Sequence, residues 1–192
     1  KMHQRVRGDY HSTAGEQKSY SAADSDLIAW VHLVFTDAFL RSHQKMGRSI
    51  PARDGALGAD RYVDEWAKAG VLMGYPTPPR SEQELEHALE DFIPQLRRDE
   101  RVDQALQFII DPPLPRTVKA GYWVLAQAAI ASLEPRYRRL LGLRRPWWPA
   151  LSLGRIMVAF TGWVLGAESP SMERARHRIN QLPPGKREPL TA

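Results

Sequence analysis

Apolar residues recur every three or four positions along most of the chain, which is the spacing of amphipathic helices. No segment shows the strict alternation of a half-buried strand. Residues 1–7 read as the end of a helix and residues 8–19 as a polar loop. We therefore expect an all-α fold, a multi-helix bundle of about seven or eight helices. The predicted helices cover residues 24–46, 58–73, 81–96 with a kink or an end at Pro94, 101–110, 116–132, 135–142, 150–166 and 169–180.

Capping residues set several of the predicted helix ends. Asp24 or Ser25 can cap the first long helix at its N-terminus, and Gly47 supplies its stop. Ser81, with Glu84 three residues later, has the sequence pattern of a capping box. These residues fix where the predicted helices begin and end more sharply than hydrophobic spacing alone.

The predicted helix over residues 24–46 carries apolar side chains on almost every face, as a central, buried helix does. Two polar side chains, His32 and Asp37, interrupt its apolar part. By helical spacing, the face around His32 presents Ile28, Phe35, Thr36 and Phe39.

A buried imidazole needs a partner for each ring nitrogen, which leaves two interpretations of His32. One is a core histidine that hydrogen-bonds to a backbone carbonyl or to Asp37, and the residues taken alone favour it. The other is a metal or haem ligand in a dry aromatic pocket, because neutral imidazole is the commonest metal ligand in proteins. Asp37 lies too far round the helix to be assigned as the acceptor that orients His32.

The amino-acid composition limits the kinds of metal site and partner that the chain can have. The 192-residue chain contains no cysteine, so disulfides, thiolate-bound iron and cysteine-based zinc sites are excluded. The net charge of +5 suits an anionic partner such as a phosphate surface, an acidic lipid or the propionates of haem, and it selects none of them. Residues 1–20 lack the apolar stretch of a signal peptide, and we expect a location in the cytoplasm or peripheral to a membrane.

Five short motifs, one of them in two parts, follow each other along nearly the whole chain. They are residues 1–8, 20–32 (YSAADSDLIAWVH), 61–66 (RYVDEW) with 74–76 (GYP), 112–115 (PPLP) and 134–143 (EPRYRRLLGL). In this order the five motifs together resemble those of the MpaB-type oxygenases and rubber oxygenase (latex clearing protein).

The resemblance implies an all-α, haem b-dependent oxygenase that uses dioxygen, in a family that includes enzymes cleaving an isoprenoid double bond. It implies that His32 is the axial ligand of the iron. His3 would have a catalytic role, by hydrogen-bonding to dioxygen or tuning its access. Arg138, and less directly Arg136, match a basic position near the cofactor, where an arginine can pair with a propionate. The cofactor-binding residues expected from these considerations are His32, Arg138, Arg136, Phe35 and Thr36.

The domain expectation follows from the same resemblance. Residues 1–182 are expected to form a single helical domain, the C-terminal two-thirds of an oxygenase-like domain, and residues 183–192 a tail. Sequence preceding Lys1, with helices that help to wall the family's pocket, is expected to be missing. The substrate is expected to be a hydrophobic small molecule, isoprenoid-like or lipid-like.

Two other function classes stay open on the sequence. One is a non-enzymatic helical module that binds lipid or a partner and has lost haem. The other is a basic nucleic-acid binder, for which the basic residues 174–178 are the only support, so no nucleic acid is expected.

The apolar segment over residues 147–167 has three interpretations. A buried or groove-lining helix is favoured over contact with a membrane surface, and a span is least favoured because Arg155 lies near the segment's centre. The spacing of Gly154, Gly162 and Gly166 permits close contact with another helix.

Overall fold

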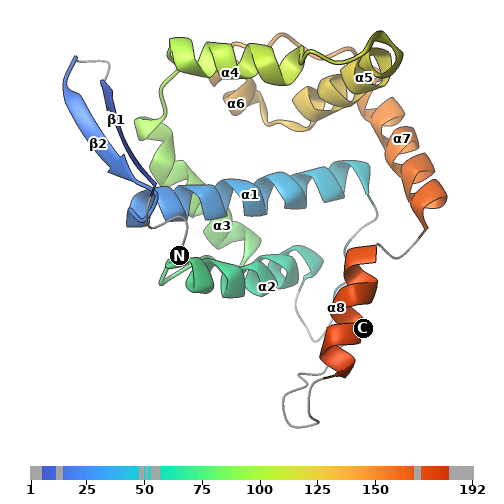
Figure 1. The fold of residues 1–192 in the computed structure, drawn as a ribbon, viewed down its shortest axis with the longest axis horizontal. Helices are drawn as coiled ribbons and strands as arrows, with labels where there is room; N and C mark the ends of the chain where they lie inside the picture. The colour runs from blue at the N-terminus through green and yellow to red at the C-terminus, as the bar shows by residue number, and fades with distance from the viewer. Residues whose placement is uncertain are drawn as a thin grey trace.

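The computed structural model describes residues 6–11, 15–47, 50, 52, 57–166 and 170–181. Within them the chain forms eight α-helices, a short 3-10 helix and one two-stranded hairpin, so the predicted helical class is confirmed (Figure 1). The elements are β1 (Arg7–His11), β2 (Gln17–Ser21), α1 (Ser25–Met46), α2 (Gly58–Met73), α3 (Glu82–Phe92), the 3-10 helix η2 (Ile93–Gln95), α4 (Glu100–Ile110), α5 (Arg116–Ser132), α6 (Pro135–Leu140), α7 (Ala150–Leu165) and α8 (Pro170–Asn180).

Helix α1 runs through the middle of the molecule, with α2 on one side and α4, α5 and α6 on the other (Figure 1). It contacts α2, α3, α5 and α7. Part of the α1 surface remains exposed beside this packing, because Phe35 and Phe39 are 52% and 50% exposed. The sequence predicts burial all round α1, whereas the described residues bury one face. The side chains that form the core are Leu33, Leu40, Val63, Leu85 and Leu89.

The helix ends agree with the predicted capping residues. Asp24 is the N-cap of α1 and Gly47 its C-cap. The Ser81 hydroxyl accepts a hydrogen bond from the Glu84 backbone N–H at 3.2 Å, as in a capping box. The Glu84 carboxylate accepts from the Arg80 N–H instead of the Ser81 N–H, so only half of the predicted box forms.

Strands β1 and β2 form an antiparallel hairpin, so the assignments of residues 8–19 to a loop and of Arg7 to a helix end are wrong. The register pairs Arg7 with Ser21 and His11 with Gln17. The described side chains of both strands are mostly exposed, so neither face has to be apolar and the alternation that marks a half-buried strand is missing. Backbone hydrogen bonds define this hairpin, and side-chain pattern alone could not reveal it.

Most of the apolar segment over residues 147–167 forms helix α7. It packs against α5, where a Cβ at Gly154 would lie 2.6 Å from the Ala128 Cβ. The predicted close contact is therefore found at Gly154, whereas no atom lies within 4 Å of a Cβ built at Gly162. Arg155 Nε donates to the Lys45 carbonyl oxygen at 2.6 Å, which ties α7 to the end of α1. Within the described ranges, no helix has both the length and the apolar character needed to cross a bilayer.

Candidate functional site

His32 lies in α1, on the face that packs against α2, and its side chain is 1% exposed. The buried face also carries Leu33 and Thr36. The Thr36 hydroxyl donates to the His32 carbonyl oxygen at 2.8 Å, so this hydroxyl is used within the α1 backbone. The predicted placement of Thr36 beside His32 on a buried helix face is what the structure shows.

Helix α2 and the segment after it form the wall around the His32 ring. A Cβ at Gly70 would lie 2.9 Å from Cε1 and 3.0 Å from Nε2 of His32, so the missing side chain leaves the space that the imidazole occupies. The same Cβ would lie 3.0 Å from the Pro78 Cβ. The ring centroid of Trp66 is 6.5 Å from that of His32, and the Tyr75 ring lies edge-on at 5.8 Å. The imidazole is therefore enclosed by aromatic rings and a glycine.

Neither ring nitrogen of His32 has a hydrogen-bond partner among the described residues, and both nitrogens are buried. A buried polar atom without a partner costs about 1–3 kcal/mol, so native structures rarely leave one without a reason. Burial lowers the pKa of His32 below its ordinary value, because the charged form is poorly solvated there. The ring is thus neutral near pH 7, the form of imidazole that binds metal ions.

A row of aromatic side chains runs from the wall of His32 to the surface of the molecule. Trp66 stacks on Phe39, with ring centroids 5.8 Å apart, and Phe39 stacks on Phe35 at the same distance. Phe35 therefore forms the exposed end of this row, whereas the rings beside His32 are those of Trp66 and Tyr75. An exposed aromatic row next to a buried imidazole is suited to contact with an apolar ligand.

A groove of about 700 Å³ begins at the inner part of this row and ends at α7. Its volume is within the usual range for small-molecule sites, about 300–1,000 Å³. The lining is mainly apolar, and His43 is its one titratable imidazole. Phe39 and Trp66 belong to both the groove and the aromatic row, so the groove reaches the wall of His32. The groove is lined by Phe39, Ser42, His43, Met46, Gly47, Ile50, Tyr62, Trp66 and Val158.

Arg136 and Arg138, the two predicted propionate partners, lie in α6. Arg136 forms ion pairs with Glu90 at 3.3 Å and Glu134 at 2.9 Å. Arg138 donates to the Leu133 carbonyl oxygen at 3.3 Å. In this structure both guanidinium groups are directed to protein partners, and their role toward a cofactor stays a prediction.

Asp37 lies on the side of α1 that is near Arg136. It is five residues beyond His32, about 140° round the helix, and it pairs with Arg41 at 3.1 Å. Burial raises the pKa of Asp37, and the charges of Arg41 and Arg136 partly offset that effect. The structure thus brings His32, Phe35 and Thr36 together on α1 and places Arg136 near Asp37 on another side of the helix.

His3 lies outside the described residues, so its predicted catalytic role stays a prediction. Sequence reasoning alone missed Gly70 and Tyr75 as the wall of the His32 ring. The spacing of Trp66 and Gly70, one helical turn apart, signals that they share a face of α2. No pattern in a single sequence tells which helix that face will meet.

The chain matches a family model over residues 1–184, and that family is described as "ER-bound oxygenase mpaB/B'/Rubber oxygenase, catalytic domain". The fold and the enclosed histidine therefore occur in an oxygenase catalytic domain, and the chain belongs to this family. Neither a curated protein nor a solved structure matches the chain.

Proposed function

We propose that this chain is a haem-dependent oxygenase domain that acts on a hydrophobic substrate, isoprenoid-like or lipid-like, with His32 as the axial ligand of the iron. The family supplies the oxygenase class. The observation that carries the haem proposal is the buried His32 ring, whose two nitrogens have no partner among the described residues.

The chemistry of His32 and its neighbours is compatible with a role as axial ligand of a haem iron. A porphyrin supplies the equatorial ligands itself, so one protein imidazole is sufficient to hold its iron. Among the described residues no group of three or more His, Asp or Glu is placed to hold a metal ion by protein ligands alone. The space left by Gly70 and the packing of Trp66 and Tyr75 fix the orientation of the imidazole, which a ligand needs.

The chain contributes binding, orientation and exclusion of water. Haem, when bound, supplies the activation of dioxygen. The apolar groove that meets Phe39 and Trp66 would hold the substrate beside the wall of His32 and keep water away. Phe35 would extend the apolar contact surface, and Thr36 would hold the α1 backbone at His32 through its hydroxyl.

Three further residues keep the roles that the family resemblance implies. His3 would act at the oxygen-binding side of the site, and Arg138 or Arg136 would pair with a propionate. Such pairing requires each arginine to leave its present protein partner, the Leu133 carbonyl for Arg138 and two glutamates for Arg136.

Hemin titration of the purified chain tests the role of His32. We expect a Soret band to form with wild type, and its position and intensity to change or the band to vanish with His32→Ala. His43→Ala is the matched control, because His43 lies on the same helix, is exposed, and lines the groove. Adding imidazole to His32→Ala is expected to restore much of the band if the protein ligand is the only part missing.

The outcomes separate a lost ligand from a lost fold. Circular dichroism of His32→Ala establishes that α1 and its neighbours are still formed. A band that is the same in wild type, His32→Ala and His43→Ala would show that hemin binds elsewhere and would overturn the assignment of His32. No band in any of them would remove the haem proposal for this chain.

A second candidate is a helical module that binds a lipid or a partner without haem. The observation that favours it is the groove, whose lining is apolar and needs no cofactor to bind a hydrophobic ligand. This module would bind an apolar fluorescent probe with hemin absent and show no Soret band with hemin present. Hydrophobic binding accompanied by a His32-dependent Soret band would favour the oxygenase.

A further inference from the structure

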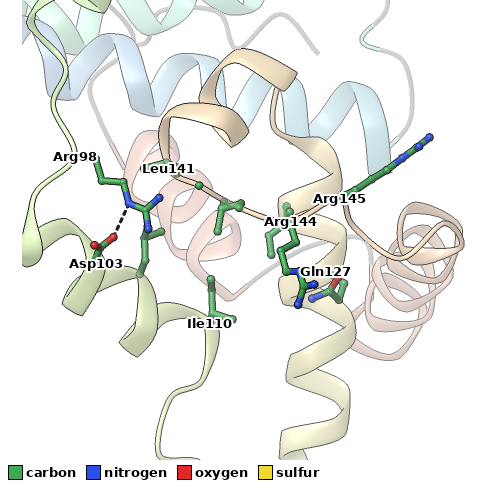
Figure 2. Close-up of a pocket in the computed structure, with 11 residues that line it drawn as sticks. Arg98, Asp103, Ile110, Gln127, Leu141, Arg144 and Arg145 are labelled. Carbon is green, nitrogen blue, oxygen red and sulfur yellow. Dashed lines mark hydrogen bonds and ion pairs between the residues drawn. The ribbon is translucent and has the colours of Figure 1, made fainter.

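A second pocket, of about 380 Å³, lies between α4, α5 and the segment of residues 141–145 that leaves α6 (Figure 2). It is on the α4–α5 side of α1, whereas His32 faces α2, so it is separate from the site proposed above (Figure 1). Its volume is again within the range of small-molecule sites. The pocket combines an aliphatic floor with three arginines, one aspartate and the side-chain amide of Gln127.

The turn that ends α6 builds one wall of this pocket. The Leu143 N–H donates to the Arg138 carbonyl oxygen and the Gly142 N–H to the Arg139 carbonyl oxygen, the hydrogen bonds of a Schellman motif. Gly142 has a φ of +61°, a left-handed conformation that favours glycine. A Cβ at Gly142 would overlap the Arg98 guanidinium, so the glycine also makes room for this side chain. Arg98 is thus seated over the turn rather than loosely placed on the surface.

The charged side chains directed to the pocket carry one positive charge that no acidic residue among the described ones balances. Arg98 Nε is paired with Asp103 at 2.6 Å, which neutralises most of that guanidinium's charge. Arg144 forms no hydrogen bond or ion pair with any residue that the structure describes, and it lies on the opposite side of the pocket from Arg98 (Figure 2). Arg145 also lines the pocket, but its guanidinium is directed away (Figure 2). Arg144 is therefore the cation that an anionic ligand would meet.

Gln127 adds a neutral donor beside Arg144. Its side-chain oxygen accepts from the Trp147 N–H at 3.5 Å, which orients the amide. The amide nitrogen of Gln127 then remains available as a donor on the pocket side. An arginine and an amide donor together can bind both oxygens of a carboxylate.

We propose that this pocket binds an amphipathic monocarboxylate of the fatty-acid class. The carboxylate would be held by Arg144 and Gln127, and the alkyl chain would lie over the aliphatic floor. A single carboxylate matches Arg144, the guanidinium directed to the pocket that has no partner among the described residues, because a dianion would leave one charge unmatched in a partly apolar site. The floor consists of Leu106, Ile110, Ile130, Leu141 and Leu143.

Displacement of a fluorescent fatty acid from the full chain, without hemin, tests this proposal. Dodecanoate is expected to displace the probe, whereas dodecanol, which has the same chain and no charge, should be at least about tenfold weaker because it loses the charge-assisted hydrogen bonds. Arg144→Gln is expected to weaken dodecanoate binding about tenfold for the same reason. Arg145→Gln is the matched control, with an expected change of less than twofold.

Each alternative result overturns a defined part of the proposal. Equal affinity for dodecanoate and dodecanol would show an apolar site with no role for charge. Affinity that Arg144→Gln leaves unchanged would place the fatty acid elsewhere, for example in the groove next to His32. Equal losses for Arg144→Gln and Arg145→Gln would indicate a general electrostatic effect instead of a site. Displacement by inorganic phosphate as efficient as by dodecanoate would show an anion site without an alkyl pocket.

Discussion

Gly70 has no side chain at a position where α1 and α2 come into close contact, and the His32 ring occupies the space. In an exposed helix a Gly→Ala change stabilises a protein by about 1 kcal/mol through helix propensity. At position 70 the added methyl would lie 2.9 Å from the His32 ring, and overpacking of this kind costs about 1–3 kcal/mol. The balance at this position therefore depends on sterics rather than on propensity.

We predict that Gly70→Ala lowers the free energy of unfolding by about 1–2 kcal/mol and weakens hemin binding, because the imidazole must move. Gly162→Ala is the control: it lies within α7, and a Cβ there meets no atom within 4 Å, so it should add about 0.5–1 kcal/mol of stability. Urea unfolding followed by circular dichroism measures both changes. Equal effects of the two substitutions would contradict the assigned packing of His32 against Gly70.

The lowered pKa of His32 gives the haem-free protein a pH-dependent stability. Below about pH 6.5 the unfolded chain protonates this imidazole while the folded chain keeps it neutral, so the unfolded state binds more protons. Stability therefore falls as the pH decreases from about 6.5, and the loss ends once the pH is below the folded pKa. His32→Gln, with no titrating ring, should lack this contribution.

Chemical denaturation of wild type and His32→Gln between about pH 7.5 and 5 measures this effect. We expect the stability of wild type relative to the variant to decrease as the pH falls through that window. A difference between the two proteins that is the same at every pH would show that His32 titrates alike in the folded and unfolded states.

At the scale of the elements, helix positions were predictable from sequence because spacing and caps are local. The predicted 58–73 and 116–132 match α2 and α5, and the predicted break at Pro94 is where α3 gives way to η2. The hairpin was missed because it buries neither face. Which faces of α1 are covered was also not predictable, since burial depends on which other helices pack against it.

Part of the candidate site was likewise predictable from the sequence, and part was not. His32 stands out in sequence as a polar residue within an apolar helix, and the structure places it in an aromatic enclosure. The residues that pack against its ring, Gly70 and Tyr75, are 38 or more positions away along the chain. Contacts between distant segments depend on helix packing, which a single sequence does not encode in a local pattern. For Arg136 the sequence motif predicts a propionate as partner, whereas its ion-pair partners in the structure are two glutamates.

Arg41 connects three helices through its guanidinium. It contacts Asp37 in its own helix at 3.1 Å, Glu82 and Glu86 of α3 at 3.5 and 2.5 Å, and Glu134 before α6 at 3.6 Å. The arginine side chain is 22% exposed, so solvent screens these contacts only in part. Without Arg41 these four carboxylates would lose their shared cation, and among the described residues only Glu134 would keep an ion pair, with Arg136 at 2.9 Å.

We predict that Arg41→Met lowers the free energy of unfolding by about 2 kcal/mol, because charge-assisted hydrogen bonds are lost and the carboxylates repel. Arg61→Met is the control, since the ion pair of Arg61 within the described residues is with the exposed Glu65 one turn away, and its loss should cost less than about 0.5 kcal/mol. Thermal or urea unfolding compares them. A loss for Arg41→Met as small as that for Arg61→Met would show that the cluster does not hold α1, α3 and α6 together.

At the scale of the whole molecule, positive charge and exposed aromatic residues gather in the same part of the chain. Residues 135–181 contain nine arginines and two glutamates, so they carry more positive charge than the net +5 of the whole chain. The same region exposes Trp148 and Trp163, at 91% and 80%, together with Phe160. Arginine beside exposed tryptophan is the composition of proteins that bind the surface of an anionic membrane.

We therefore predict that the chain binds vesicles containing phosphatidylserine more tightly than vesicles of phosphatidylcholine alone, and that salt weakens this binding. Replacing Trp148 and Trp163 together by alanine should weaken it at least about tenfold, since each ring loses a contact with the lipid interface. Leu72→Ala is the matched control, because Leu72 is 88% exposed on α2, outside the basic region, and it should change binding less than twofold. Vesicle co-sedimentation measures all three proteins. If the tryptophan variant and Leu72→Ala bind alike, the exposed rings of α7 and the segment before it do not contact lipid, and the basic charge alone accounts for any attraction to the vesicles.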